Sequence, residues 1–275
     1  MRILIIGDIV GKPGREAVRK GLKVVVDAHA IDFVVANVEN AAAGFGITKD
    51  IGDTILDWGV DVMTSGNHIW DKKEALPYVA SEPRMLRPAN YPAGVPGRGS
   101  ILAQSGDGRA VGVINVMGRV HMAPLDNPFT VVLKEIDALR ARTKIILVDM
   151  HAEATSEKVA MGWHLDGKVT AVVGTHTHVQ TADERVLPQG TAYITDMGMT
   201  GPHDSIIGME REPSLARFLT GMPTRFEPAT GDARLNAVVI DADDKTGRAA
   251  SITRLSLTPA DIEALAARTA HAVTS

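Results

Sequence analysis

The sequence predicts an α/β fold in which one domain, residues 1–275, places two mixed sheets between helices. In the N-terminal part, short continuous apolar runs alternate with amphipathic stretches, as parallel strands do when right-handed helical crossovers join them. Two later pairs of strand-like runs flank Gly106-Asp107-Gly108 and Asp244-Lys245-Thr246-Gly247, and these hairpin signals add antiparallel strands. The sequence contains no internal repeat, low-complexity tract or linker, so a single domain is expected.

The N-terminal part predicts strands with helices between them. The strands expected there are residues 3–6, 32–38 and 60–64, each an apolar run that ends at polar residues. Pro13 and Gly14 open the first helix, whose apolar positions recur with helical spacing up to His29. The second helix, residues 49–58, is stopped by Gly59.

The rest of the chain adds a loop excursion and a second set of strands. Residues 77–99 are rich in Pro and Gly and are expected to form a looping excursion with short strands. The further strands expected are residues 101–104, 110–116, 144–150, 169–173, 191–195, 235–241 and 249–257. We also expect an amphipathic helix at 130–142, a glycine-rich loop at 198–208, and a final helix capped by Thr258.

Composition argues against several function classes. The net charge is −4 with no long run of one sign, which argues against an extended nucleic-acid surface. No stretch is long and apolar enough to span a membrane, and a strand that begins at the second residue leaves no room for a signal peptide, so we expect a cytoplasmic protein. Cysteine is absent, so any metal must be held by nitrogen and oxygen donors.

Side chains of metal-binding type follow five of the predicted strands. Sites in open α/β sheets are built where strands end, and His176-Thr177-His178 closes an apolar run there. The other strand ends carry Asp8, then Glu39 and Asn40, then Asn67 and His68, and finally His151. One ion needs fewer donors, so we expect a two-metal site in which a carboxylate bridges ions about 3.5–4 Å apart. The mixed donors suit iron, manganese or zinc. Taken singly, some of these donor residues have a structural explanation instead: Asp8 could cap a helix, and Asn40 and Asn67 could be turn residues.

The order of these motifs resembles the metallophosphoesterase superfamily and, most closely, its branch of YmdB-like cyclic-nucleotide phosphodiesterases. The resemblance is carried by residues 1–11, Asn37-Val-Glu-Asn40, Ser65-Gly-Asn-His68, His151-Ala-Glu-Ala-Thr155, Thr175-His-Thr-His178 and Asp196-Met-Gly-Met-Thr-Gly-Pro202. These stretches run through nearly the whole chain, and their order and spacing together are highly specific. The resemblance implies a four-layer α-β-β-α sandwich of two mixed sheets.

Carried over by position, the resemblance assigns the donors to two metals that share Glu39. It implies that the first metal is held by Asp8, Glu39, Asn40 and His178, and the second by Glu39, Asn67, His151 and His176. It also implies that His68 is a general acid rather than a ligand. Most of the superfamily has Asp-x-His on the first strand and bridges through a Gly-Asp pair, whereas this chain has Asp8-Ile9-Val10 and Glu39-Asn40. These departures favour the narrower branch.

The resemblance further implies an enzyme that opens 2′,3′-cyclic nucleotides at the 2′ oxygen, with iron as its metal and a homo-oligomeric assembly. Two cations lower the pKa of a shared water, so hydroxide is available at neutral pH to attack phosphorus. An alkoxide is a poor leaving group, so a proton from His68 is expected to raise the rate by about 10²–10⁴-fold. The enzymatic alternatives are a 3′,5′-cyclic nucleotide phosphodiesterase or a phosphomonoesterase. A low-turnover regulatory protein that binds metal and nucleotide is the alternative from another class.

Three further residues are candidate substrate contacts. Glu153 and Thr155 closely follow His151, although helix capping explains them equally well. His203 lies in a Gly-Pro-His-Asp loop and is either a substrate contact or an ordinary loop residue.

Overall fold

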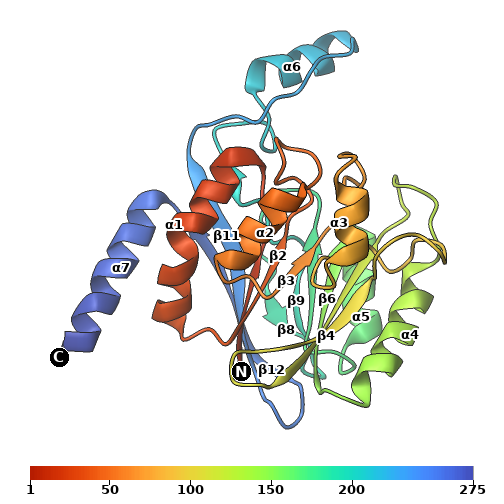
Figure 1. Ribbon diagram of the computed structural model, residues 1–275, viewed down its shortest axis with the longest axis vertical. Coiled ribbons are helices and arrows are strands. Elements are labelled where there is room, and N and C mark those ends of the chain that lie inside the picture. Colours follow the sequence, from red (N-terminus) through yellow and green to blue (C-terminus); the bar gives the residue numbers. More distant parts are fainter. Residues whose placement is uncertain (275) are drawn as a thin grey trace.

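Two β-sheets lie face to face between outer helices in the computed structural model, which describes residues 1–274 (Figure 1). The first sheet contains the parallel strands β1 (Arg2–Ile6), β2 (Phe33–Asn37) and β3 (Val62–Thr64). Three antiparallel strands extend it on the β1 side: β11 (Ala233–Ala242), β12 (Ala249–Leu257) and β10 (Gly201–Pro202). In this register Ile5 of β1 lies between Val35 of β2 and Val238 of β11.

The second sheet is also mixed. Its strands, in spatial order, are β4 (Ser100–Gln104), β5 (Ala110–Met117), β6 (Ile145–His151), β7 (Ala171–Thr175), β9 (Ala192–Ile194) and β8 (Arg185–Val186). The four central strands are parallel, and the two edge strands are antiparallel to their neighbours. The two predicted mixed sheets are therefore confirmed.

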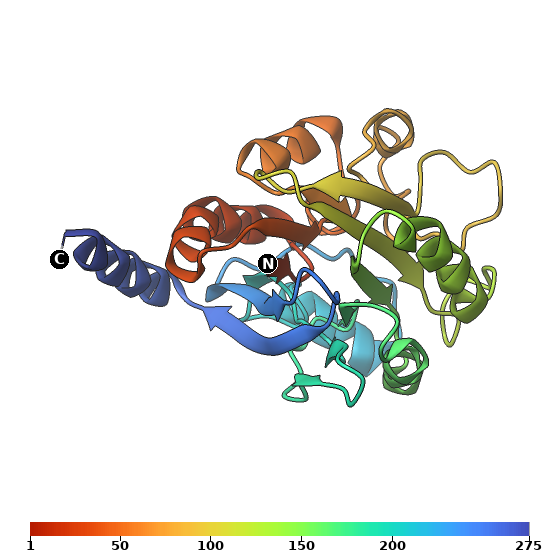
Figure 2. The ribbon, with the colours of Figure 1, turned by 90° about the horizontal axis from the view of Figure 1, so that it is seen from below.

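Helices cover the outer face of each sheet, as the view from below shows (Figure 2). The helices on the side of the first sheet are α1 (Gly11–His29), α2 (Lys49–Asp57), α3 (Ala75–Ser81) and α7 (Pro259–Thr274). The second sheet is covered by α4 (Pro128–Arg140) and α5 (Thr155–Leu165). None of the helices in the described residues has the length and apolar content that crossing a membrane requires.

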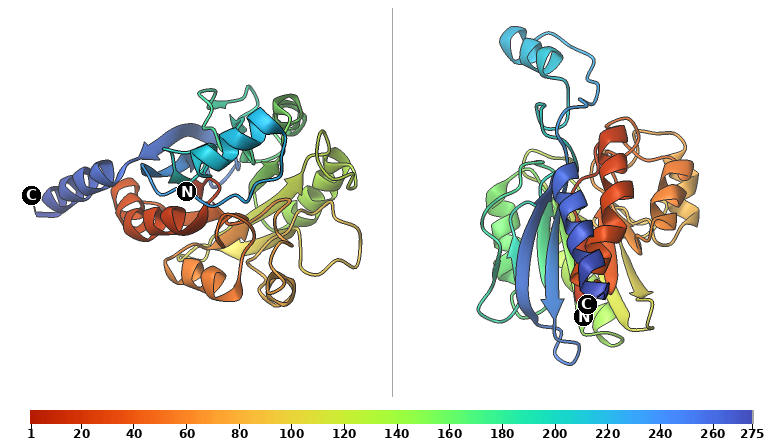
Figure 3. Two further views of the ribbon diagram at one scale, coloured as in Figure 1. Left: turned by 90° about the horizontal axis from the view of Figure 1, so that it is seen from above. Right: turned by 90° about the vertical axis from the view of Figure 1, so that its left-hand side faces the viewer.

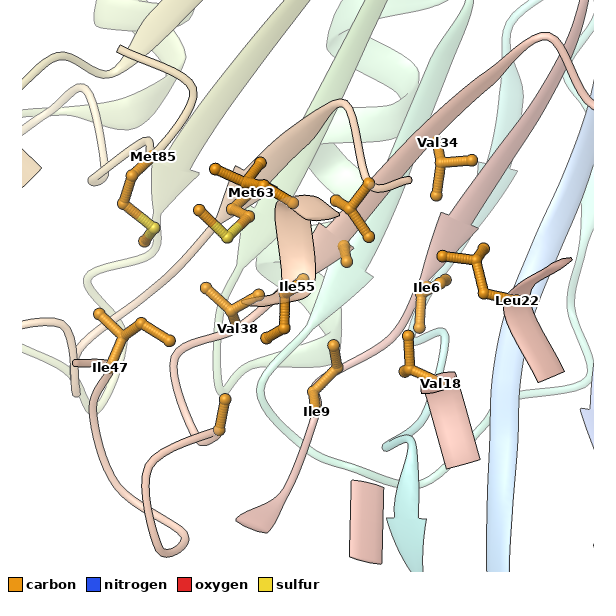
Figure 4. Packing of buried hydrophobic residues seen from close by; sticks show 14 of the residues in the cluster. Ile6, Ile9, Val18, Leu22, Val34, Val38, Ile47, Ile55, Met63 and Met85 are labelled. Atoms are coloured by element: carbon orange, nitrogen blue, oxygen red, sulfur yellow. The ribbon is translucent and has the colours of Figure 1, made fainter. Parts of the chain in front are cut away.

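Apolar packing fills the spaces between the layers because side chains alternate along each buried strand. Leu4 and Ile6 of β1 belong to the cluster under the outer helices, whereas Ile3 and Ile5 belong to the cluster between the sheets. Figure 4 shows the outer cluster, in which Ile6 lies near Val18 and Leu22 of α1. A third cluster joins the second sheet to α4 and α5. The predicted four-layer α-β-β-α sandwich is confirmed.

Three helices of the structure, α3, α5 and α6, were not predicted from the sequence. Residues 77–99 were expected to be a loop with short strands, but α3 occupies the start of this stretch. Pro77 is tolerated because it lies in the first turn, where a backbone N–H has no partner within the helix. The face of α5 that covers the sheet includes Glu157 and Lys158, which interrupt its apolar period. The helix α6 (Arg211–Thr220) leaves Phe218 and Leu219 exposed, so its sequence shows no core-facing stripe.

The helix α6 stands away from the body of the protein on an arm, residues 204–231 (Figure 3). The arm is closed at its base by backbone hydrogen bonds from His203 N to Asp232 O (2.9 Å) and from Asp204 N to Gly231 O (3.2 Å). The predicted glycine-rich loop 198–208 leads into this arm and contains the short β10.

Candidate metal centre

The polar residues at or just after the ends of β1, β2, β3, β6 and β7 gather at one edge of the two sheets. Parallel strands end at the same edge of a sheet, so side chains far apart in sequence meet there. Asp8, Glu39 and His151 are completely buried, with 0% of their surface exposed. Burial of two carboxylates requires a compensating charge, which a metal ion or a protonated imidazole provides.

Glu39 and His151 form the first half of the centre. His151 Nε2 lies 3.1 Å from Glu39 Oε1 and 2.9 Å from Asn67 Oδ1. Behind the ring, the Thr175 hydroxyl donates to Asp149 at 2.7 Å and lies 3.0 Å from His151 Nδ1. The hydroxyl therefore accepts from Nδ1–H, and Nε2 faces the oxygens of Glu39 and Asn67, so a proton or a metal ion must lie between them.

Space for this ring depends on a glycine. A Cβ atom on Gly66 would lie 2.1 Å from both Nε2 and Cδ2 of His151, closer than any side chain allows. Gly66 immediately precedes the predicted ligand Asn67. The Ser-Gly-Asn-His motif thus makes room for an imidazole from the other sheet.

Asp8, Asn40 and His178 form the second half. Asn40 Nδ2 lies 3.2 Å from His178 Nε2 and 3.3 Å from Glu39 Oε1, and His178 Nε2 lies 3.8 Å from Asp8 Oδ1. His178 Nδ1 donates to Ile207 O at 2.8 Å, which leaves Nε2 unprotonated on the side of Asp8. Asp8 Oδ1 is buried and has no hydrogen-bond partner among the described residues. An orphaned carboxylate oxygen beside an imidazole lone pair fits a metal ion.

His176 faces the first half of the centre. One ligand atom from each of Glu39, His151 and His176 lies within 4.8 Å of the others, as a shared metal ion requires. The His176 Nε2 atom lies 3.0 Å from Glu153 Oε2 at the rim. His176 and His178 both adopt left-handed backbone conformations, with φ of 95° and 64°. Such conformations are strained for residues other than glycine and cluster at functional sites.

Burial and neighbouring charges shift the pKa values of the candidate ligands. Against burial, which lowers it, the charge of Glu39 raises the pKa of His151. Burial raises the pKa of Asp8 to about 6, against the opposing effect of His178. Burial favours a higher pKa for Glu39 as well, but His151 and the His68 backbone N–H outweigh it and hold the pKa at about 2. Burial, together with the nearby His151, lowers the pKa of His176 to about 3. Glu39 is therefore charged and His176 neutral at pH 7, the forms that bind metal.

A buried ion pair supports the turn between the two histidines. Lys158 Nζ of α5 lies 2.7 Å from Asp196 Oδ2, and both side chains are fully buried. The same Asp196 oxygen accepts from the Thr177 hydroxyl at 2.6 Å and from the Thr177 backbone N–H at 3.1 Å. Lys158 also donates to the Thr177 hydroxyl at 3.1 Å. Thr177 is thereby fixed from behind while its two neighbours face the centre.

His68 lies at the edge of the centre rather than within it. Its backbone N–H donates to Glu39 Oε2 at 3.2 Å, and its Nδ1 lies 2.7 Å from Asp71 Oδ2. The His68 ring meets Phe45 edge to face, with 5.0 Å between ring centroids. Its side chain is 30% exposed and lines the cavity above the centre, which a proton donor to substrate must do.

A cavity of about 720 Å³ opens above the centre. Its floor is polar and includes Glu39, Asn40, His176 and His178, with His68 and Glu153 at the side. The three predicted substrate contacts lie in different surroundings. Glu153 lines the cavity, whereas Thr155 is an exposed first residue of α5. Neither side chain caps the helix. His203 lines a neighbouring hollow that shares His178, and its Nε2 lies 3.2 Å from Asn236 Nδ2.

Known proteins are similar to this chain in both sequence and fold. The model of the YmdB-like protein family matches residues 4–255. The chain belongs to the YmdB-like family. A Bacillus subtilis relative named 2′,3′-cyclic-nucleotide 2′-phosphodiesterase is 50% identical over 255 residues, which are 93% of this chain and 96% of the relative.

Two solved structures are similar to this YmdB-like protein in fold as well as in sequence. A hypothetical protein from Thermus thermophilus is 43% identical, with a TM-score of 0.87 over 94% of this chain and 99% of that one. A structure described as a novel phosphatase, from Mycoplasma pneumoniae, is 32% identical, with a TM-score of 0.88 over 96% of each chain. The predicted family and fold are confirmed.

Sequence reasoning missed the residues that support the YmdB-like centre from behind. Asp71 follows His68 by three residues, a spacing at which a carboxylate could have been noticed. Asp196 lies in a stretch that carried the resemblance, but no role was predicted for it. Lys158 gave no signal, because a lysine in an amphipathic helix normally faces solvent.

Proposed function

We propose that this YmdB-like protein is a two-metal phosphodiesterase that hydrolyses 2′,3′-cyclic nucleotides at the 2′ oxygen. The enzyme class, phosphodiesterase, is confirmed by the relatives. The substrate rests on the printed activity of the Bacillus subtilis relative. The metal centre rests mainly on Glu39, whose Oε1 lies 3.1 Å from His151 Nε2 and 3.3 Å from Asn40 Nδ2. That position between the two halves is the one a bridging carboxylate needs.

The proposed ligand sets share this carboxylate. The first metal would be held by Asp8, Glu39, Asn40 and His178, and the second by Glu39, Asn67, His151 and His176. When bound, two such ions supply a nucleophile by acidifying a water and neutralise charge on the phosphoryl oxygens. The donor set suits iron, manganese or zinc, and the family resemblance makes iron the first expectation.

His68 is the proposed proton donor. With Nδ1 bound to Asp71 Oδ2, its Nε2 is the nitrogen left to carry a proton to the leaving oxygen. The Asp71 carboxylate orients the ring. The contact with Phe45 restrains the ring from another side. His68 therefore has the geometry of an acid fixed in one orientation.

A substrate panel tests the proposed activity. The purified protein, supplied with iron or manganese, is offered 2′,3′-cyclic AMP, 3′,5′-cyclic AMP, an aryl diester and an aryl monoester. We expect 2′,3′-cyclic AMP to be turned over fastest and to give the 3′-monophosphate. Preference for the monoester would support a phosphatase instead, the activity named for the Mycoplasma pneumoniae structure. Background rates on all four would support the regulatory alternative.

The His68→Ala variant tests the mechanism separately. We expect it to keep its metals and to lose about 10²–10⁴-fold in kcat, because it lacks the proton donor and no metal ligand. His121→Ala, at an exposed position outside the cavity, is the matched control and should behave as wild type. Full activity of His68→Ala would exclude the acid role. We also expect a homo-oligomer, as the family resemblance implies, which sedimentation velocity measures directly.

A further inference from the structure

The cavity above the centre has two chemically different sides. Its floor carries the candidate metal ligands and would receive the phosphoryl group. Its opposite wall belongs largely to the arm and is mostly apolar, with Ile206, Ile207, Met209, Phe218 and Phe226. Metal binding and phosphoryl chemistry do not require an apolar wall, so the wall serves another part of the ligand.

Aromatic residues are concentrated at this cavity. Only 4% of the chain is aromatic and it has 5 phenylalanines, yet Phe45, Phe218 and Phe226 all line this one space. Flat aromatic side chains present the faces on which nucleobases stack in proteins that bind single-stranded nucleic acid. This concentration indicates a flat, aromatic group in the ligand.

Two of these rings are held in place, as a stacking platform requires. Phe45 and Phe226 both pack against a small buried cluster formed by Val10, Met199 and Met209. The guanidinium carbon of Arg217 lies 5.6 Å from the centre of the Phe226 ring. Arg217 also lines the cavity, so it can hydrogen-bond to the edge of a base or lie over its face.

The platform lines the same cavity as the site proposed for the phosphoryl group. Phe45 touches the ring of His68, which lies beside the site proposed for the phosphoryl group. Phe226 lines the same cavity from the arm. A cavity of about 720 Å³ lies within the range of about 300–1,000 Å³ that is typical for small-molecule ligands.

We propose that Phe45, Phe226 and Arg217 form a nucleobase subsite, with Phe226 as the stacking residue that determines preference for nucleotides over simple phosphodiesters. This inference rests on the proposed function, because it assigns the base of the substrate to the arm. The predicted result is that the arm contributes to substrate binding and leaves phosphoryl chemistry to the centre.

The test compares a substrate that has a base with one that has none. Wild type, Phe226→Leu and Phe226→Tyr are assayed on 2′,3′-cyclic AMP and on ethylene phosphate, a cyclic diester without sugar or base. Phe226→Leu keeps apolar contact with the Met199–Met209 cluster but removes the ring. We expect its kcat/KM for 2′,3′-cyclic AMP to fall by about 10-fold or more, mostly through KM, with little change on ethylene phosphate. Phe226→Tyr keeps an aromatic ring and should retain the nucleotide preference of the wild type.

Leu219→Ala is the matched control on the same helix as Arg217. Leu219 is 76% exposed and is absent from the cavity lining, so its truncation should leave both substrates unaffected. An equal loss on both substrates in Phe226→Leu, or no loss on either, would overturn the proposed subsite.

Binding of adenosine to metal-free protein provides a readout without turnover. We expect wild type and Phe226→Tyr to bind adenosine measurably more tightly than Phe226→Leu. Equal affinity in all three would overturn the subsite, whatever the substrate panel shows. A wild-type enzyme that binds adenosine through Phe226 but leaves 2′,3′-cyclic AMP intact would contradict the proposed function and keep the subsite. The two proposals can therefore fail separately.

Discussion

Substitution of Thr177 by valine is predicted to weaken metal binding without touching a ligand. Thr177 lies between His176 and His178, and its hydroxyl contacts Asp196 Oδ2 at 2.6 Å and Lys158 Nζ at 3.1 Å. Valine has nearly the same shape but no hydroxyl, so Thr177→Val removes both contacts and keeps the backbone bond to Asp196. Thr177→Ser keeps the hydroxyl and is the matched control.

The expected magnitude follows from two opposing energies. Holding a residue other than glycine in a sparsely populated backbone conformation costs about 1–3 kcal/mol, and both histidines are held at positive φ. A hydrogen bond to a charged group contributes about 1.5–3 kcal/mol, which is of similar size. Loss of the hydroxyl therefore lets the turn relax and the two imidazoles move off the centre. Supporting contacts of this kind are worth about 10–100-fold in metal affinity, and we expect a loss in that range.

The assay is a competitive metal titration of wild type, Thr177→Val and Thr177→Ser, with thermal unfolding of the metal-free proteins alongside. We expect Thr177→Val to lose affinity for both proposed metals, since each proposed ligand set takes one histidine from the turn. Thr177→Ser should bind nearly as wild type. Wild-type affinity in Thr177→Val, at whatever unfolding temperature, would refute the reasoning.

Three further predictions concern other supports of the centre. Asp71→Asn should keep both metals and lower kcat, by less than the effect of His68→Ala, because it misorients the acid without removing it; metal analysis with steady-state kinetics checks this, and unchanged kcat would contradict it. Gly66→Ala should displace His151, since its Cβ would lie 2.1 Å from Nε2, and so reduce metal content; metal content equal to wild type would count against that geometry. Metal affinity should fall as the pH drops through about 6, because burial raises the pKa of Asp8 to about 6 and the ion must then displace its proton. Calorimetry in buffers of different ionisation enthalpy measures this proton release, and affinity that is constant through this pH range would contradict it.

The strand ends were predictable because sequence and local physics agree there. The strand at Ile3–Ile6 is a continuous apolar run that stops at Gly7-Asp8, and the sandwich buries such runs on both faces. Since parallel strands of one sheet end together, the ligand types indicated that Asp8 and Glu39 would meet, and His151 joins them from the second sheet. The helix over 130–142 was displaced by two residues, since Asn127 caps it and its side chain accepts from Phe129 N.

The supports of the centre were not predictable, because they depend on how distant elements pack. Lys158 and Asp196 are 38 residues apart and meet only because α5 lies over the end of β9. Burial turns this lysine from an ordinary helix-surface residue into the partner of a buried carboxylate. The helix α6 of the arm was not predicted, because its apolar residues Phe218 and Leu219 face solvent and give the sequence no core-facing period.

Metal content per chain tests the central claim most directly. We predict about two ions per chain in the wild type and the loss of both in Glu39→Ala, because the two proposed ligand sets share this carboxylate. Glu184→Ala, which removes a carboxylate paired with Arg254, is the control and should keep two. A single ion in the wild type, or one ion retained at full affinity in Glu39→Ala, would contradict a centre bridged by Glu39.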